Sequence, residues 1–122
     1  MAIVPNRYRG KKEYSLVYAE MITAAKYRGT VTYQEIAKIM SLPLQGSHMG
    51  KEIGWILGEI SEDEVTNGRP MLSAIAVNVK FEPGPGFFTL ARDLNKLQDE
   101  DEDAFWNKER QLVYEKWKVV LE

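Results

Sequence analysis

The segment from Thr30 to Gly58, TVTYQEIAKIMSLPLQGSHMGKEIGWILG, decides the fold because it predicts two helices joined by a short turn. Thr32 and Glu35 form the T-x-x-E pattern of a capping box, and apolar residues follow directly. A helix is therefore expected to begin near Tyr33. Pro43 cannot continue this helix, because its ring removes a backbone donor and clashes with the preceding turn.

The rest of this segment predicts the other helix, which we expect from Ser47 to Gly58, with Ser47 as its N-cap after a sharp turn at Gly46. A helix-turn-helix unit places its second helix in the major groove of DNA in many proteins. Gly50, Gly54 and Gly58 recur every four residues and share one face of this helix. A glycine inside a helix costs about 1 kcal/mol relative to alanine. We interpret the glycine face as tight packing against another element, with close approach of nucleic acid or a partner as the alternative.

Periodicity and turn residues predict the remaining elements. The expected elements are a helix over 14–28, a break at 61–70, a buried strand over 71–79, a Pro-Gly loop at 81–88, and helices over 88–97 and 104–120. The Pro-Gly loop is interpreted as a wing or a hairpin tip. The five consecutive acids at 99–103 are interpreted as a solvated link and helix start, because carboxylates favour a helix N-terminus.

These elements predict one α+β domain of winged helix-turn-helix type, with a small β-sheet and extra C-terminal helices, spanning 1–122. Within it, residues 1–13 form a basic arm and residues 98–122 form a C-terminal helical extension. The chain contains no cysteine, which excludes disulfides, a thiol nucleophile and thiolate metal sites. It also holds a single histidine, so we expect no metal cluster, no cofactor and no enzymatic activity. Apolar runs are too short to span a membrane, and we expect a cytoplasmic protein.

Charge is distributed unevenly along the chain. The net charge of −2 does not indicate a nucleic-acid partner. However, residues 1–58 hold eight basic and four acidic residues, whereas residues 59–122 hold eight basic and fourteen acidic residues. The helix-turn-helix therefore lies in the basic half. This asymmetry fits a phosphate-facing surface, and the alternative is that these side chains only solvate an exposed face.

The leading hypothesis is that the protein binds double-stranded DNA without catalysing a reaction. The candidate contacts are polar and cationic side chains of the turn, the second helix, the arm and the Asn-Gly turn: Gln45, Ser47, His48, Lys51, Arg7, Arg9, Lys11, Lys12 and Arg69. For Arg69, a salt bridge within the acidic half is an equally good interpretation. Phe87 and Phe88 could stack on bases, but we expect them to anchor the Pro-Gly loop to the core. The alternative function is a protein-interaction or dimerisation module that uses Trp106, Trp117 and the glycine face.

The order of these motifs resembles the DNA-binding half of the alkylguanine-DNA alkyltransferases and the alkyltransferase-like proteins, over about Thr30 to Val79. The match includes Thr32, Tyr33 and an Ile-Ala pair at 36–37. The family's reactive Pro-Cys-His-Arg segment, which has Trp for Cys in the inactive members, is replaced here by Pro-Met-Leu-Ser at 70–73. The family's second helix also carries an arginine that fills the space of a flipped base, and SHMGKEIG contains none. The resemblance thus implies a winged-helix-like scaffold and duplex binding, without alkyl transfer or lesion recognition.

Overall fold

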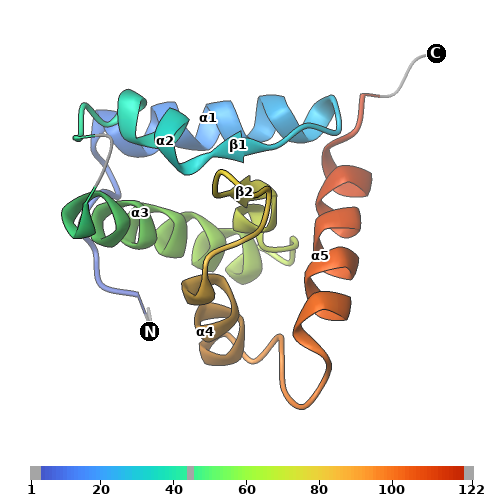
Figure 1. Cartoon of the computed structure of the whole chain (residues 1–122). Helices are drawn as coiled ribbons and strands as arrows, with labels where there is room; N and C mark the ends of the chain where they lie inside the picture. Colours follow the sequence, from blue (N-terminus) through green and yellow to red (C-terminus); the bar gives the residue numbers. More distant parts are fainter. Residues whose placement is uncertain (1–3, 44–45, 120–122) are drawn as a thin grey trace.

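A computed structural model describes residues 4–43 and 46–119, and these form five α-helices, a short 3-10 helix and two short strands around one apolar core (Figure 1). The elements in chain order are α1 (Lys12–Lys26), β1 (Val31–Thr32), α2 (Tyr33–Ile39), α3 (Ser47–Thr66), the 3-10 helix η1 (Leu72–Ile75), β2 (Ala76–Val77), α4 (Pro85–Asp93) and α5 (Glu102–Trp117). In Figure 1, α1 and α2 lie above α3, and α5 closes the side opposite the start of α3.

The two helices predicted on either side of the turn are present as α2 and α3. The Thr32 hydroxyl accepts a hydrogen bond from the Glu35 backbone N–H at 3.1 Å and caps α2 as the sequence predicts. The start of α3 differs by one position, because Gly46 is the N-cap and Ser47 is the first helical residue. Gly46 has a φ of 98°, which side chains rarely tolerate, so the sharp turn requires a glycine here.

Helix α3 runs past Gly58 to Thr66, and the break predicted at 61–70 is wrong for its first six residues. The prediction assumed that the acidic run would be solvated. Instead, Glu59, Glu62 and Glu64 are buried and bonded to cationic, amide or phenolic donors, so their charges do not disrupt the helix. The Asn-Gly turn then ends α3, and Gly68 adopts a φ of 76°.

The strand predicted over 71–79 is largely wrong. This segment is the 3-10 helix η1 followed by β2, which pairs in parallel with β1, Val31 opposite Ala76 and Thr32 opposite Val77. The predicted burial is confirmed, because every residue from 71 to 77 is buried. Helices α1, α3 and α5 all contact η1, so the segment lies in the centre of the fold. Its neighbours there are mainly helices rather than strands.

The predicted wing is also wrong in its second half, because helix α4 begins at Pro85 inside the Pro-Gly loop. Proline is favoured at the first helical position, where its missing N–H is not needed. Phe87 is buried and Phe88 is half-buried, which confirms that they anchor the segment. Within the described residues, the two strands β1 and β2 form the only sheet, and it contains no hairpin. The fold is therefore α+β, with helices dominating.

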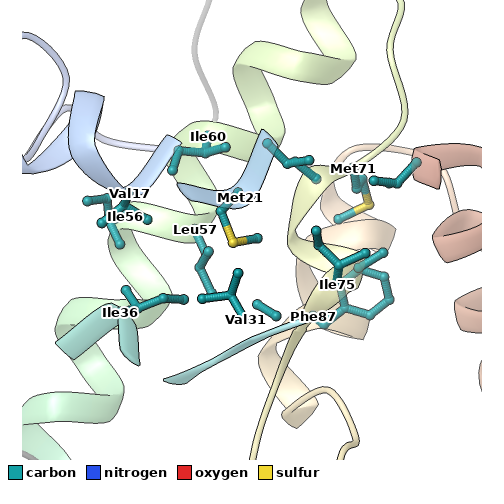
Figure 2. Packing of buried hydrophobic residues seen from close by; sticks show 14 of the residues in the cluster. Val17, Met21, Val31, Ile36, Ile56, Leu57, Ile60, Met71, Ile75 and Phe87 are labelled. Carbon is teal, nitrogen blue, oxygen red and sulfur yellow. The ribbon is translucent and has the colours of Figure 1, made fainter. Parts of the chain in front are cut away.

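The C-terminal helix α5 begins as the acidic run predicts, since the Asp101 carboxylate accepts a hydrogen bond from the Ala104 N–H at 2.9 Å. Its Trp106 indole N–H donates to the Ala74 carbonyl at 2.8 Å and joins α5 to η1. Figure 2 shows the centre of the core, where Met21 of α1 and Ile75 of η1 lie among side chains from α2, α3 and α4. No helix of the described ranges combines the length and the apolar character required to cross a membrane.

Candidate nucleic-acid interface

The first three turns of α3 present an exposed surface that carries no uncompensated acid. His48 and Lys51 are exposed, as are Gly50 and Gly54. The first turn contains no acidic residue, and the one carboxylate that follows, Glu52, is buried. The exposed surface of this half of the helix is therefore cationic and sterically open.

Glu52 is held away from this surface by the N-terminal arm. The Arg7 guanidinium makes two hydrogen bonds to the Glu52 carboxylate, at 2.9 and 3.1 Å, and lies 4.4 Å from the centre of the Trp55 ring. The Tyr8 hydroxyl donates to the same carboxylate. These donors, Tyr8 first, lower the pKa of Glu52, so the carboxylate stays ionised and paired at neutral pH.

Arg9 makes the second link between the arm and α3. Its guanidinium pairs with Glu62 at 2.8 Å and with Asp63 at 3.1 Å, and it is mostly buried. The sequence predicts Arg7 and Arg9 as phosphate contacts, whereas the structure engages both in ion pairs within the molecule. Their positive charges neutralise carboxylates of α3. Both arginines therefore position the helix against the arm.

Glu59 fixes the backbone of the arm. It is fully buried, and its carboxylate accepts hydrogen bonds from the backbone N–H groups of Arg7, Tyr8 and Arg9, at 2.6, 3.0 and 3.3 Å to one oxygen. Several backbone N–H groups that point at one anion form a stable anion-binding site. Here the arm supplies the N–H groups and the helix supplies the anion. The arm consequently follows α3 along its length.

The remaining candidates divide between exposed and paired positions. Lys11 and Lys12 are exposed, and Lys11 lies 5.7 Å from the centre of the Tyr8 ring. Arg69 pairs with the buried Glu64 at 2.7 Å, which matches the salt-bridge interpretation. Gln45 and the side chain of Ser47 lie outside the described part of the chain. The exposed candidates are thus His48, Lys51, Lys11 and Lys12, together with Arg7, which is exposed but paired with Glu52.

Sequence reasoning missed the carboxylates of α3 and the tyrosines that bind them. Tyr8, Tyr14 and Tyr18 donate their hydroxyls to Glu52, Asp63 and Glu64, respectively. The available signal was charge complementarity between an Arg- and Tyr-rich segment at 7–18 and an acid-rich segment at 52–64. This signal predicts a contact only when the two segments are already expected to lie side by side.

The tyrosine pairs predict a stability that falls at alkaline pH. Burial, followed by the bond to Glu64, raises the pKa of Tyr18 to about 12. Burial, followed by the bond to Asp63, raises the pKa of Tyr14. The folded state thus favours the neutral phenol. Its contribution is complete below the ordinary tyrosine pKa of about 10 and is lost as the pH rises through the folded values. We expect the ultraviolet absorbance of tyrosinate to develop later in the folded protein than in urea.

The control for this titration is Tyr18→Phe, which should remove one late-titrating phenol and leave the rest of the curve unchanged. A folded protein, judged by circular dichroism, whose phenols all ionise near the value of free tyrosine would contradict the assignment.

The glycine face of α3 is open at two of its three positions. A Cβ added to Gly58 would lie 3.3 Å from a methyl of Val4, so this glycine supports the packing interpretation. A Cβ added to Gly50 or Gly54 would meet nothing within 4 Å. The packing interpretation is therefore wrong for these two positions, which border a cavity of about 470 Å³ between α3 and the start of α4.

Comparisons of the chain with protein-family models, with curated proteins and with solved structures find no match.

Proposed function

We propose that the protein binds double-stranded DNA through the exposed surface of the first three turns of α3. The observation that carries this proposal is that Glu52 is buried against Arg7 and Tyr8, which leaves Lys51 as the exposed cation of that surface, beside the exposed side chain of His48. A helix without a free acid and with two bare glycines can approach a phosphate backbone closely. Helix-turn-helix proteins use the start of their second helix in this way.

The arm has a supporting role in this proposal. Arg7 and Arg9 are engaged with α3, Arg7 while partly exposed, and Lys11 and Lys12 are exposed. We infer that these two lysines add affinity by counterion release, while the arginines keep the carboxylates of α3 neutralised.

We further propose that the scaffold is a distant variant of the winged-helix architecture of the alkyltransferase-like proteins, without an antiparallel wing. The order of its elements supports this relation: a Thr-capped α2, a turn with a proline, α3, and a buried segment that begins at Pro70 and ends in β2.

Replacing Lys51 by glutamate is expected to weaken DNA binding and to reduce its dependence on salt. The change removes one phosphate contact, so the slope of the logarithm of the binding constant against the logarithm of salt concentration should fall in magnitude by about 1. The measurement is fluorescence anisotropy of a labelled mixed-sequence duplex at roughly 50 and 200 mM salt, between which we expect the unaltered protein to lose at least about tenfold in affinity.

Lys26→Glu is the matched control, because Lys26 is also exposed and ends α1 at the side of the domain opposite the start of α3 (Figure 1). It makes the same change in net charge. Equal weakening by both variants would show that only net charge matters and would refute the assigned surface. Absence of binding at either salt concentration would refute DNA binding altogether.

A protein-interaction module is the second candidate, and the loop after β2 favours it. Val79 and Phe81 are 74% and 67% exposed, and Phe81 has a φ of 61°, an unfavourable backbone conformation for an aromatic residue. The Asn78 side chain holds this loop through the N–H groups of Lys80 and Glu82. In contrast, Trp106 is bonded to Ala74 and contributes to the fold rather than to a free surface.

A further inference from the structure

The cavity beside α3 has the size and lining of a small-molecule site. Its volume of about 470 Å³ lies in the range of about 300–1,000 Å³ that ligand pockets occupy. The walls come from α2, α3 and α4 and include Tyr33, Met49, Ile53, Phe87 and Leu90. None of the described residues that line the cavity is charged.

Glycines form the open floor of this cavity, and packing does not require them there. A Cβ at Gly50, Gly54 or Gly86 would meet nothing within 4 Å, so alanine would fit at each position. Two of these glycines lie inside α3, where each is less favourable for the helix than alanine. The sequence therefore keeps the cavity open at a position where larger side chains would stabilise the helix.

Two hydroxyl groups provide the polar side of the cavity, and both have a proton to donate. The Tyr33 hydroxyl accepts a hydrogen bond from the Gly84 N–H at 2.6 Å. Ser73, which is 95% buried, accepts one from the Ser61 hydroxyl at 2.6 Å. Neither hydroxyl donates to an acceptor among the described residues. Burial raises the pKa of Tyr33, so its phenol keeps the proton at neutral pH.

We propose that this cavity binds a small, uncharged aromatic molecule that carries a hydrogen-bond acceptor. The absence of charged groups from the described lining excludes ionic recognition, and the hydroxyls of Tyr33 and Ser73 match an acceptor atom. The rings of Tyr33 and Phe87 and the thioether of Met49 favour an aromatic ring, through edge contacts and sulfur–aromatic contacts. This site shares Gly50 and Gly54 with the proposed DNA-binding surface but requires no DNA, so titrations of the protein alone test it separately from the proposed function.

The test compares quinoline with naphthalene, which has the same shape but lacks the acceptor nitrogen, in titrations of the protein alone followed by amide NMR. We expect quinoline to shift the N–H signals of Gly50, Gly54 and Gly86 in a saturable way. It should bind roughly fivefold more tightly than naphthalene, the value of one hydrogen bond. Tyr33→Phe should reduce that preference without lowering the affinity for naphthalene. If quinoline causes no saturable shift at these glycines, or binds no better than naphthalene, the proposal is refuted.

Gly54→Leu provides a second test that does not depend on a destabilised variant. Leucine fills the cavity and is a better helix former than glycine, so the melting temperature should not fall while quinoline binding is lost. Thr23→Leu, at an exposed position of α1 outside the cavity lining, is the control and should bind quinoline as the unaltered protein does. Unchanged quinoline binding by Gly54→Leu would place the ligand elsewhere and refute the site.

Discussion

Replacing Glu59 by alanine is expected to lower the free energy of unfolding by about 3–5 kcal/mol, because several amides lose a charged acceptor and a hydrogen bond to a charged group contributes about 1.5–3 kcal/mol. The carboxylate accepts backbone N–H groups from three consecutive residues of the arm and is fully buried. Alanine would leave these amides without their acceptor. Chemical denaturation followed by circular dichroism measures the loss.

Glu59→Gln separates the charge from the shape. The amide keeps one acceptor oxygen but presents a donor where the carboxylate has its second oxygen, so we expect about half of the alanine effect. Glu20→Ala, at an exposed position of α1, is the control and should change stability by less than about 0.5 kcal/mol.

The arm gives a local readout of the same contact. In the unaltered protein, the amides of Arg7, Tyr8 and Arg9 should exchange slowly with solvent, and trypsin should cleave slowly after the two arginines. Both rates should rise in Glu59→Ala under conditions where the rest of the domain stays folded. Fast exchange of these three amides in the unaltered protein would contradict the described anchoring.

The part of the fold that was predictable from sequence is the part that local chemistry specifies. Thr32 caps α2 three residues before the amide it binds, and Asp101 does the same for α5, so both starts can be read from short patterns. The start of α4 was also available, because Pro85 occupies the first helical position. Interpreting the prolines and glycines only as turn residues concealed this helix.

The elements that were not predictable depend on contacts between distant segments. The acids of α3 remain helical because Arg9 and Tyr18 reach them from more than 40 residues away. The segment 71–77 forms a 3-10 helix because three helices surround it, and its apolar composition is equally suitable for a buried strand. Burial was therefore predictable there, while the backbone conformation was not.

In the candidate site, too, some features follow from local sequence and others depend on distant contacts. The exposure of His48 and Lys51 follows from their positions near the start of α3, next to the predicted turn. The engagement of Arg7 and Arg9 does not follow from sequence, because an arginine near a chain end gives no local sign of its partner. The sequence thus predicts the exposure of His48 and Lys51, whereas Arg7 and Arg9 neutralise carboxylates of the helix that they were expected to assist.

Replacing Phe87 by alanine is expected to destabilise the protein by about 3–5 kcal/mol, the range for deleting a buried phenylalanine side chain. Phe87 is 6% exposed, and its ring lies 5.2 Å from the ring of Phe88 and 5.9 Å from that of Phe105, measured between centroids. It connects α4 to α5 and the core, so its loss should free the segment that replaces the predicted wing. Urea denaturation of both forms gives the difference in unfolding free energy.

The matched control is Phe81→Ala, which makes the same chemical change at the other end of the Pro-Gly loop. Phe81 is exposed, so little burial is lost, and the stability should change by less than about 0.5 kcal/mol. A large effect at 87 with a small one at 81 would show that the loop is held to the core by its second half alone. Equal losses would instead mean that both rings are buried in solution, and the exposed apolar loop that favours a protein partner would not exist.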